Sequence, residues 1–237
     1  MISALTMYGA GLRGGAESRS RQHARLVDGT IVPFPLERYL GPADATDEQV
    51  LDGLRGPVLD VGCGPGRHLH TLAARGIFAL GVDLSPVAVE LAIGGGGRAI
   101  VGDIFDELPR SGSWRSALLL DGNIGIGGSP VRLLGRIAGL LAADGELLVE
   151  LGSPDEVTCS TLARLEADGV ASAWFPWARV AVAEIGPIAR AGGFRDVETW
   201  ARAGRWFARL HRDDRHSGPR HPRRHPARRL GRAGSVP

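Results

Sequence analysis

The strongest constraint on the fold lies in residues 57–76, which read PVLDVGCGPGRHLHTLAARG. Val58 to Val61 is a short apolar run interrupted only by Asp60, as expected for a strand buried on both faces. Three glycines follow within five residues, and apolar side chains then recur at helical spacing from Leu69. Glycines permit a sharp turn and let a ligand approach the free amides of a helix N-terminus. The stretch therefore predicts a strand, a nucleotide-binding turn and a helix.

The spacing of the glycines distinguishes two kinds of nucleotide-binding turn. A dinucleotide fingerprint, GxGxxG, needs a third glycine where this chain has Arg67, which disfavours a nicotinamide enzyme. The motif DVGCGPGR instead resembles the first motif of class I S-adenosylmethionine-dependent methyltransferases. A glycine turn that packs a strand on a helix without any ligand is the alternative interpretation.

The resemblance covers about residues 45–211. It implies an α/β, Rossmann-like, doubly wound fold with a seven-stranded, mostly parallel sheet and a closing antiparallel hairpin. The end of the chain fits this expectation, because a helix predicted over residues 184–191 is followed by strands predicted over 196–201 and 205–210.

Acidic residues follow three further predicted strands. Asp83 ends a strand expected over residues 77–82, roughly 20 residues beyond the glycine loop, where an acid accepts hydrogen bonds from ribose hydroxyls. In the resembled family, the position of Asp103 holds the adenine amino group and its neighbour Ile104 packs on the ring. Asp121 ends a strand expected over residues 116–120. For each acid the alternative is a capping or solvated turn residue.

The resemblance implies S-adenosyl-L-methionine as the cofactor. Asp121 and Asn123, in a glycine-rich loop, are candidates to contact its methionine end or the acceptor. No spacing of Cys, His or acidic residues predicts a metal site. The implied cofactor-binding residues are Asp60, Gly62, Cys63, Gly64, Gly66, Asp83, Leu84, Asp103, Ile104 and Asp121.

No catalytic residue is assigned from the sequence. A hydroxyl or acidic carbon acceptor would need a general base, and His68, His70, Asp121 and Glu150 are the candidates. The two histidines are expected on a solvent-facing side of the first helix. Glu150 is equally consistent with a paired surface carboxylate.

Three regions are expected: an irregular or helical cap over residues 1–45, a methyltransferase domain over 46–211, and a tail over 212–237. Part of residues 12–25 is expected to be helical, and Thr46 to Gln49 reads as a capping box. In the resembled family, helices ahead of the first strand cover the cofactor. The cluster WFPW at 174–177 predicts either a wall of the acceptor pocket or a pair of core strands.

The charge of the chain is concentrated in the tail. All 28 Lys-plus-Arg residues are arginine, and the net charge is +2. Eight Arg against two Asp beyond Leu210 give this tail +6, so the body carries about −4. The tail has almost no apolar residue and is expected to be disordered, either solvated or bound to nucleic acid through phosphates.

These observations favour a cytoplasmic S-adenosylmethionine-dependent methyltransferase acting on a small molecule. No apolar run approaches the ~18 residues of a membrane span, and neither a signal peptide nor a disulfide framework is apparent. One alternative is an RNA or protein methyltransferase that docks through the tail, although the loop DGNI after the fourth strand differs from the NPPY type associated with base amino groups. Another is a cofactor-binding protein without catalysis. The oligomeric state is not apparent from the sequence.

Overall fold

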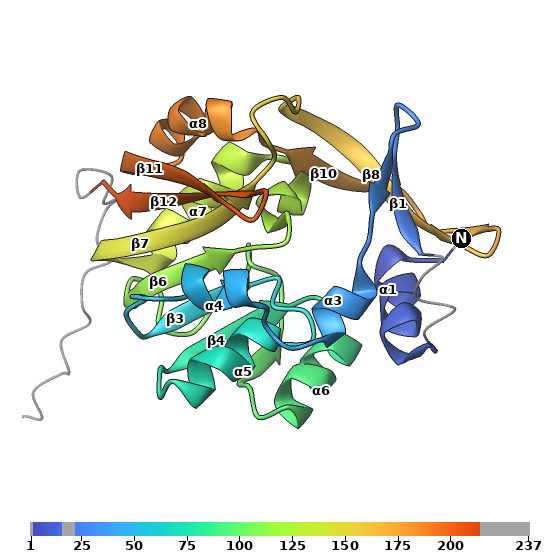
Figure 1. The fold of residues 1–237 in the computed structure, drawn as a ribbon, viewed down its shortest axis with the longest axis horizontal. Helices are drawn as coiled ribbons and strands as arrows, with labels where there is room; N and C mark the ends of the chain where they lie inside the picture. The colour runs from blue at the N-terminus through green and yellow to red at the C-terminus, as the bar shows by residue number, and fades with distance from the viewer. Residues whose placement is uncertain (1, 16–21, 214–237) are drawn as a thin grey trace, which may run out of the picture.

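The computed structural model describes residues 2–15 and 22–213. A large central sheet carries helices on both faces, and a smaller antiparallel sheet lies over one of its edges (Figure 1). The predicted tail lies outside the described residues, apart from its first two positions.

The central sheet has seven strands in the order β11-β12-β7-β6-β3-β4-β5. The five from β7 to β5 are parallel, and β12 runs antiparallel to both β7 and β11. The predicted Rossmann-like fold with a closing hairpin is confirmed. The strands are β3 (Val58–Val61), β4 (Ala79–Asp83), β5 (Ala99–Val101), β6 (Trp114–Leu119), β7 (Leu141–Leu151), β11 (Phe194–Arg202) and β12 (Arg205–Arg212).

Successive side chains of the central strands point to opposite faces of the sheet, so the core has two layers. Leu119 of β6 packs in the layer under α7 and α8, whereas its neighbour Leu118 packs in the layer under α4 and α5. Because both faces are covered, these central strands are apolar throughout. The helices of the two layers are α4 (Ala45–Val50), α5 (Arg67–Ala74), α6 (Pro86–Gly94), α7 (Pro130–Leu140) and α8 (Ile185–Ala191), with a short 3-10 turn, η2 (Val182–Glu184), before α8.

Two helix starts are fixed by capping side chains. Ser85 caps α6 by accepting a hydrogen bond from the amide of Ala88, and Pro86 takes the first helical position. The predicted capping box of Thr46 and Gln49 is wrong. Asp44 caps α4 instead, and Asp47 completes the reciprocal box, because an aspartate two residues earlier reaches the free amides equally well.

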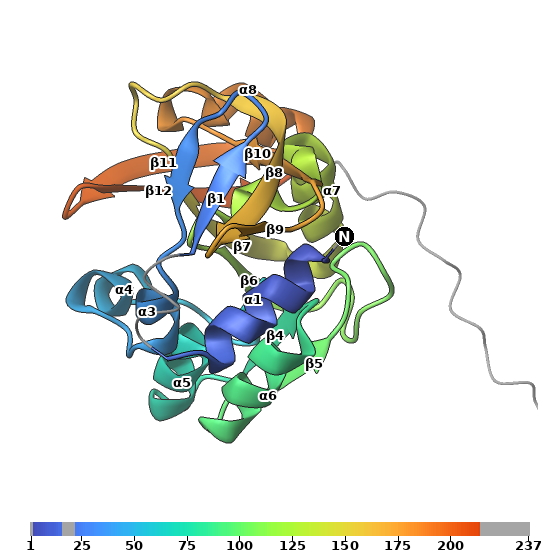
Figure 2. The ribbon, with the colours of Figure 1, turned by 90° about the vertical axis from the view of Figure 1, so that its right-hand side faces the viewer.

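The N-terminal segment contains a helix earlier than predicted. Helix α1 (Ala4–Arg13) begins where Ser3 accepts a hydrogen bond from the amide of Thr6, and Gly14 ends it. Residues 23–26 form a strand, so the end of the segment 12–25, expected to be partly helical, is extended instead. Helix α1 packs beside α6, as Figure 2 shows, and the short α3 (Leu36–Leu40) joins the same cluster.

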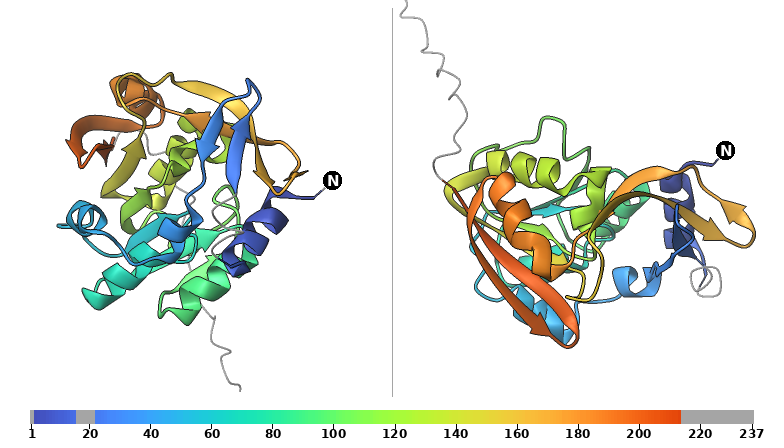
Figure 3. Two further views of the ribbon diagram at one scale, coloured as in Figure 1. Left: turned by 45° about the vertical axis from the view of Figure 1, so that its right-hand side comes forward. Right: turned by 90° about the horizontal axis from the view of Figure 1, so that it is seen from above.

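The second sheet is assembled from distant parts of the chain and was not predicted. Its order is β10-β8-β1-β2, all antiparallel, with the two-residue β9 (Val170–Ala171) paired to β8. Figure 3 shows the blue N-terminal strands beside the gold strand β8. We call this sheet the roof. Its other members are β1 (His23–Leu26), β2 (Ile31–Pro33), β8 (Cys159–Ala167) and β10 (Phe175–Arg179).

The roof is tied to the central sheet through a glycine-rich turn, η1 (Asn123–Gly128), which follows β6. A Cβ on Gly125 would lie 2.5 Å from the Trp177 ring, and one on Gly128 would lie 2.9 Å from Pro176. Only glycine therefore lets η1 approach β10 this closely. The contact closes one side of the space between the two sheets.

Candidate functional site

The glycine loop after β3 has the geometry that its sequence predicts. Gly62, Gly64 and Gly66 have φ values of +70°, +55° and +91°, all in the left-handed region. The amide of Gly62 donates to the carbonyl of Val82 at 2.8 Å, which ties the loop to the neighbouring strand β4. Helix α5 then begins at Arg67, so its free amides face the carboxyl edge of the sheet.

Asp83 connects the end of β4 to this loop. Its carboxylate accepts the amide of Gly64 at 2.9 Å and that of Ser85 at 2.8 Å. Burial raises the pKa of Asp83, and the two amide hydrogen bonds oppose that shift. The remaining lone pairs of a carboxylate held in this way can accept further hydrogen bonds from a ligand.

The other two strand-end acids lie on either side of Asp83. Asp103 follows β5 and accepts the amide of Phe105 at 2.9 Å, which shapes the loop that carries Ile104. Asp121 follows β6 and has a φ of +56°, a left-handed conformation unusual outside glycine. Its amide donates to Glu150 at 2.9 Å.

A cavity of about 1090 Å³ lies between these strand ends and the roof. Of the predicted cofactor residues, all except Asp60 and Gly66 line it. Leu84 is 47% exposed, which is unusual for a leucine and provides an open apolar surface at the edge of the cavity.

Asp60 and Gly66 lie outside the cavity lining. Asp60 is buried within β3, its Oδ2 has no hydrogen-bond partner, and His68 Nδ1 is 3.8 Å away. Burial raises the pKa of Asp60 to about 6. A Cβ on Gly66 would lie 2.7 Å from that of Ala92, so this glycine serves the packing of α5 against α6.

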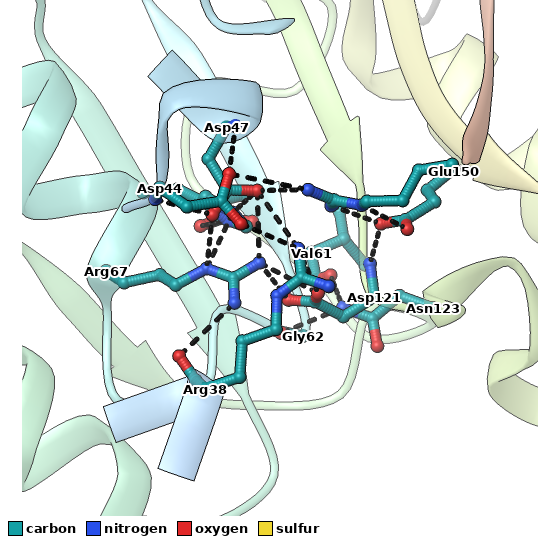
Figure 4. A network of polar contacts seen from close by, with 12 residues as sticks. Arg38, Asp44, Asp47, Val61, Gly62, Arg67, Asp121, Asn123 and Glu150 are labelled. Carbon is teal, nitrogen blue, oxygen red and sulfur yellow. Dashed lines mark hydrogen bonds and ion pairs between the residues drawn. The ribbon is translucent and has the colours of Figure 1, made fainter. Parts of the chain in front are cut away.

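A buried ionic network lies beside the cavity (Figure 4). Its centre is Asp47, which is 1% exposed and 2.8 Å from Arg205, 3.2 Å from Arg38 and 3.3 Å from Arg67. Burial raises the pKa of Asp47, but hydrogen bonds from His68 and Arg205 and the charge of Arg67 outweigh it and hold the pKa well below its usual range. The network joins α4, α5 and the closing hairpin.

The same arginines reach the strand ends. Arg205 forms a bidentate pair with Glu150, with both distances 2.8 Å, and Arg67 Nη2 lies 2.8 Å from each carboxylate oxygen of Asp121. Asn123 donates to the carbonyls of Val61 and Gly62, each at 2.9 Å. Glu150 is therefore a paired carboxylate, but an inner one rather than a surface one.

The predicted solvent exposure is wrong for His68, whereas His70 is half-buried. His68 is 4% exposed because it packs among Asp47, Asp60 and Arg67 and accepts a hydrogen bond from Arg67 Nε at 3.1 Å. His70 contacts the carbonyl of Ala92 at 3.0 Å, at the end of α6, and lies outside the cavity lining.

The aromatic cluster forms part of the roof. Phe175 and Trp177 lie on β10 with their rings perpendicular and 6.0 Å apart, and all four residues from Trp174 to Trp177 line the cavity. The cluster therefore lies on a strand that pairs with β8 and forms part of the cavity wall, and its role toward an acceptor stays a prediction.

Sequence reasoning missed several residues of the site. Tyr8 on α1 lines the cavity, and its hydroxyl would lie 3.1 Å from a Cβ on Gly64. Burial raises its pKa well above the usual value. Arg67 was considered only as a departure from a glycine pattern. The signal available for Arg67 was its charge directly after a nucleotide-binding turn; Tyr8 and Arg205 gave none.

Comparison with known proteins agrees with this geometry. Residues 58–145 match the family described as methyltransferase domain. A SAM-dependent methyltransferase from Bacteroides fragilis, solved with S-adenosyl-L-homocysteine, superposes with a TM-score of 0.70 at 18% identity, covering 89% of this chain and 94% of that one.

Two further structures share the fold. One is the 1,6-didemethyltoxoflavin-N1-methyltransferase of Burkholderia thailandensis, with TM-score 0.53, 20% identity, and coverage of 72% of this chain and 78% of that one. The other is CalS10, an amino pentose methyltransferase from Micromonospora echinaspora, with TM-score 0.52, 20% identity, and coverage of 74% and 94%.

The sheet order, the glycine loop and the strand-end acids define the class I methyltransferase architecture. The match over residues 58–145 identifies a methyltransferase domain there, and the superposed structures share this class I fold. Within residues 2–15 and 22–213, no helix is long and apolar enough to cross a membrane. The same residues contain no group of three or more Cys, His or acidic side chains placed to hold a metal.

Proposed function

We propose that the protein transfers a methyl group from S-adenosylmethionine to an apolar small molecule held under the roof. The observation that carries this proposal is that the strand ends and the roof line one shared cavity of about 1090 Å³. Pockets for one drug-sized ligand measure about 300–1,000 Å³, so this cavity has room for the cofactor and a small acceptor together.

The residues at the strand ends fit the cofactor. Asp83 keeps lone pairs for the ribose hydroxyls, and Gly62 and Gly64 place no Cβ in the space beside the loop. Leu84 and Ile104 supply apolar surface for the adenine ring, and Asp103 lies in the same loop as Ile104 to accept its amino group. Cys63 lies between Gly62 and Gly64 and lines the cavity, whereas Asp60 and Gly66 support the loop from outside the cavity.

When bound, the cofactor supplies a methyl group already activated by its sulfonium. The chain's own contribution is then mainly to position the acceptor in line with that methyl and to exclude water. The roof does both, because β8 and β10 cover the strand ends and η1 packs against β10 at one side. Methyl transfer therefore requires a bound acceptor of limited size.

The walls of the roof indicate the chemistry of the acceptor. Leu26, Val32 and Leu165 line the cavity with the aromatic residues of β10. Arg179 and Glu156 also line the cavity, but their charges pair with each other. An uncharged, largely apolar or aromatic acceptor fits such walls best, because a free charge would lose its hydration there without a partner.

The candidate general bases are already paired, which favours an acceptor that can attack the methyl group without first losing a proton to a strong base. Glu150 is paired with Arg205, Asp121 with Arg67, and His68 is enclosed by the ionic network. A neutral amine or aromatic nitrogen needs less help from a base than an alcohol does. The two named relatives are described as an N1-methyltransferase and an amino pentose methyltransferase, which is compatible with this preference.

Two experiments test the proposal. Calorimetry should detect binding of S-adenosylhomocysteine but not of NAD; the opposite result would end the cofactor assignment. A labelled methyl donor, offered with fractionated metabolite extracts, should then label an apolar fraction. Labelling of RNA or protein that disappears when residues 212–237 are removed would support the alternative instead, and binding without turnover on any fraction would indicate a non-catalytic protein.

We also propose that the protein acts in the cytoplasm.

A further inference from the structure

The amino ends of the central strands form the edge opposite the cavity, and this edge carries an exposed aromatic ring. Phe78 stands directly before β4 and is 42% exposed. Its ring stacks on the buried Trp114 with an interplanar angle of 21° and a centroid distance of 6.3 Å. A groove of about 410 Å³ lies beside the ring, and Gly56 and Gly76 also line it. Pockets for small ligands measure about 300–1,000 Å³, so the groove has room for one planar group.

Two exposed arginines face the same ring. The guanidinium carbon of Arg98 lies 5.3 Å from the centre of the Phe78 ring. That of Arg110 lies 5.6 Å from the Phe78 ring and 5.7 Å from the Trp114 ring. Within residues 2–15 and 22–213, neither guanidinium forms an ion pair or a hydrogen bond. An anion that reaches the ring therefore meets two cations whose N–H donors are available to it.

The backbone fixes the position of Arg110 at the groove. Its φ of +60° is in the left-handed region, which is unusual outside glycine. The amide of Ser113 donates to the carbonyl of Arg110 at 2.9 Å, and the amide of Gly112 donates to that of Leu140 at 2.9 Å. This turn is thus tied to the end of α7, so the backbone of Arg110 is already ordered before a ligand arrives.

Positive charge exceeds negative charge along this edge. Arg55 and Arg115 lie at the same ends of the strands, and both use one carboxylate, that of Asp144, at 3.8 Å and 2.7 Å. Arg98 and Arg110 add two unpaired cations beside them. A strip of this kind attracts phosphate groups, with an affinity that falls as salt rises.

The tail begins at this edge as well. Strand β12 runs antiparallel to β7, so it ends where β7 begins (Figure 1). Arg212 donates to the carbonyl of Leu141, and Leu141 pairs with Trp114 across β7 and β6. The tail, residues 212–237, carries a net charge of +6 and contains no Phe, Trp or Tyr. The fold therefore supplies an aromatic ring beside a basic segment that has none.

We propose that this edge docks a single-stranded nucleic acid. One base stacks on Phe78, Arg98 and Arg110 bind the adjoining phosphates, and the tail extends the positive charge along the strand. Aromatic stacking combined with a positive groove binds single strands without reading their sequence. A polymer fits better than a free nucleotide, because the positive charge continues beyond the groove into the tail.

This docking is separate from the proposed methyl transfer. The cavity lies at the carboxyl ends of the strands, whereas Phe78 and Trp114 lie at their amino ends. A strand bound at this edge is therefore not presented to the methyl donor. The edge places the protein on a nucleic acid and leaves its acceptor unchanged.

The test measures the anisotropy of a labelled oligouridine of about 12 nucleotides, within the usual span of single-strand sites. Uridine is used because an adenine could enter the proposed cofactor site. Phe78→Leu keeps an apolar side chain against Trp114 but removes the stacking face. It should weaken binding about 5- to 150-fold without changing the salt dependence.

A second variant tests the phosphate contact. Arg98→Gln should reduce the slope of log affinity against log salt concentration by about 0.7, the value for one phosphate of a single strand. Arg98 is exposed, so this variant keeps the test decisive even where Phe78→Leu does not fold. Thermal unfolding shows which variants are folded.

Arg132→Gln is the matched control. The guanidinium carbon of Arg132 lies 4.0 Å from the centre of the Phe105 ring, and both residues line the cavity at the other edge of the sheet. The variant removes the same charge from the same kind of contact, and it should leave oligouridine binding unchanged. A larger loss in Arg132→Gln than in Arg98→Gln would place the strand in the cavity and overturn the proposal.

Three other results would also overturn it. The wild type could fail to bind oligouridine. Affinity and salt slope could be equal in the wild type, Phe78→Leu and Arg98→Gln, which would assign all binding to the tail. Uridine 5′-monophosphate could bind as tightly as the oligomer, which would make the groove a site for a free nucleotide.

Discussion

Single residues at the sheet edge hold the loops in place and line the cavity at the same time. Asp83 illustrates this most directly, because the carboxylate that holds the amides of Gly64 and Ser85 also faces the cavity. Asp60, on the neighbouring strand, does not line the cavity. It is buried, its Oδ2 has no hydrogen-bond partner, and His68 lies beside it. The two acids are therefore expected to respond differently to substitution.

Asp83→Asn should weaken S-adenosylhomocysteine binding by about 10- to 100-fold, because a ligand hydroxyl loses a charged acceptor. Calorimetry at neutral pH measures the change. Asp144→Asn provides a matched control on an exposed turn, where the carboxylate is 58% exposed and pairs with Arg115. Equal affinity in Asp83→Asn and the wild type would contradict the assignment of Asp83 to the ribose.

The raised pKa of Asp60 predicts a pH effect on stability. Its pKa rises from 3.8 unfolded to about 6 in the folded protein, so the folded state prefers the neutral form. Its contribution is fully favourable below pH 4 and is lost as the pH rises through 6. Asp60→Asn, which cannot ionise, should therefore gain up to about 3 kcal/mol relative to the wild type between pH 4 and pH 7.

Urea unfolding of both proteins across that pH range measures this difference, and groups that the two proteins share cancel in it. A difference that stays flat from pH 4 to pH 7 would mean that Asp60 ionises in the folded protein as it does in the unfolded chain.

At the scale of elements, the contact between η1 and β10 holds the roof over the strand ends. Gly125 lies against Trp177 and Gly128 lies against Pro176, with no room for a Cβ at either position. The spacing between the two sheets therefore depends on two glycines in one turn. Other glycines, such as Gly135 within α7, face open space.

Gly125→Ala should destabilise the protein by about 1–3 kcal/mol, because the added methyl overpacks the contact with Trp177. Gly135→Ala is the matched control, and it should stabilise by up to about 1 kcal/mol, since alanine is the better helix former. Urea unfolding measures both, and Trp fluorescence should report a changed surrounding of Trp177 in the first variant alone. A neutral Gly125→Ala would show that η1 and β10 separate freely.

At the scale of the whole molecule, the network around Asp47 connects three parts of the chain. Arg38 and Asp47 come from the segment before the central sheet, Arg67 comes from the first crossover, and Arg205 comes from the closing hairpin. Together they fix the last hairpin to the first helices beside the cavity (Figure 4).

Arg205→Met should lower the free energy of unfolding by about 3–5 kcal/mol, because Glu150 and Asp47 keep their buried charges without this partner. Arg115→Met, which breaks an exposed pair with Asp144, should change it by less than about 1 kcal/mol. Thermal and urea unfolding at low and high salt check both values. If the two variants lose equal stability, the network contributes no more than a surface pair.

The sequence by itself determined the class of fold and, in the candidate site, the glycine loop and the strand-end acids. The strand, the glycine turn and the helix from Val58 to Ala74 are adjacent in the chain, and their periodicity and spacing are local properties. The acids that follow the strands could be placed for the same reason, because the carboxyl ends of parallel strands share one edge.

Only the tertiary structure decided the rest of the site, namely the roof and the ionic network. The roof pairs Ala24 with Leu165, and the ionic network brings Asp47 to Arg205, and no local pattern encodes such distant pairs. The fold likewise buried His68 and paired Glu150 with Arg205 away from the surface, because exposure depends on what other segments cover. Arg67 stood in the motif from the start, but its contact with Asp121, across 54 residues, required the fold.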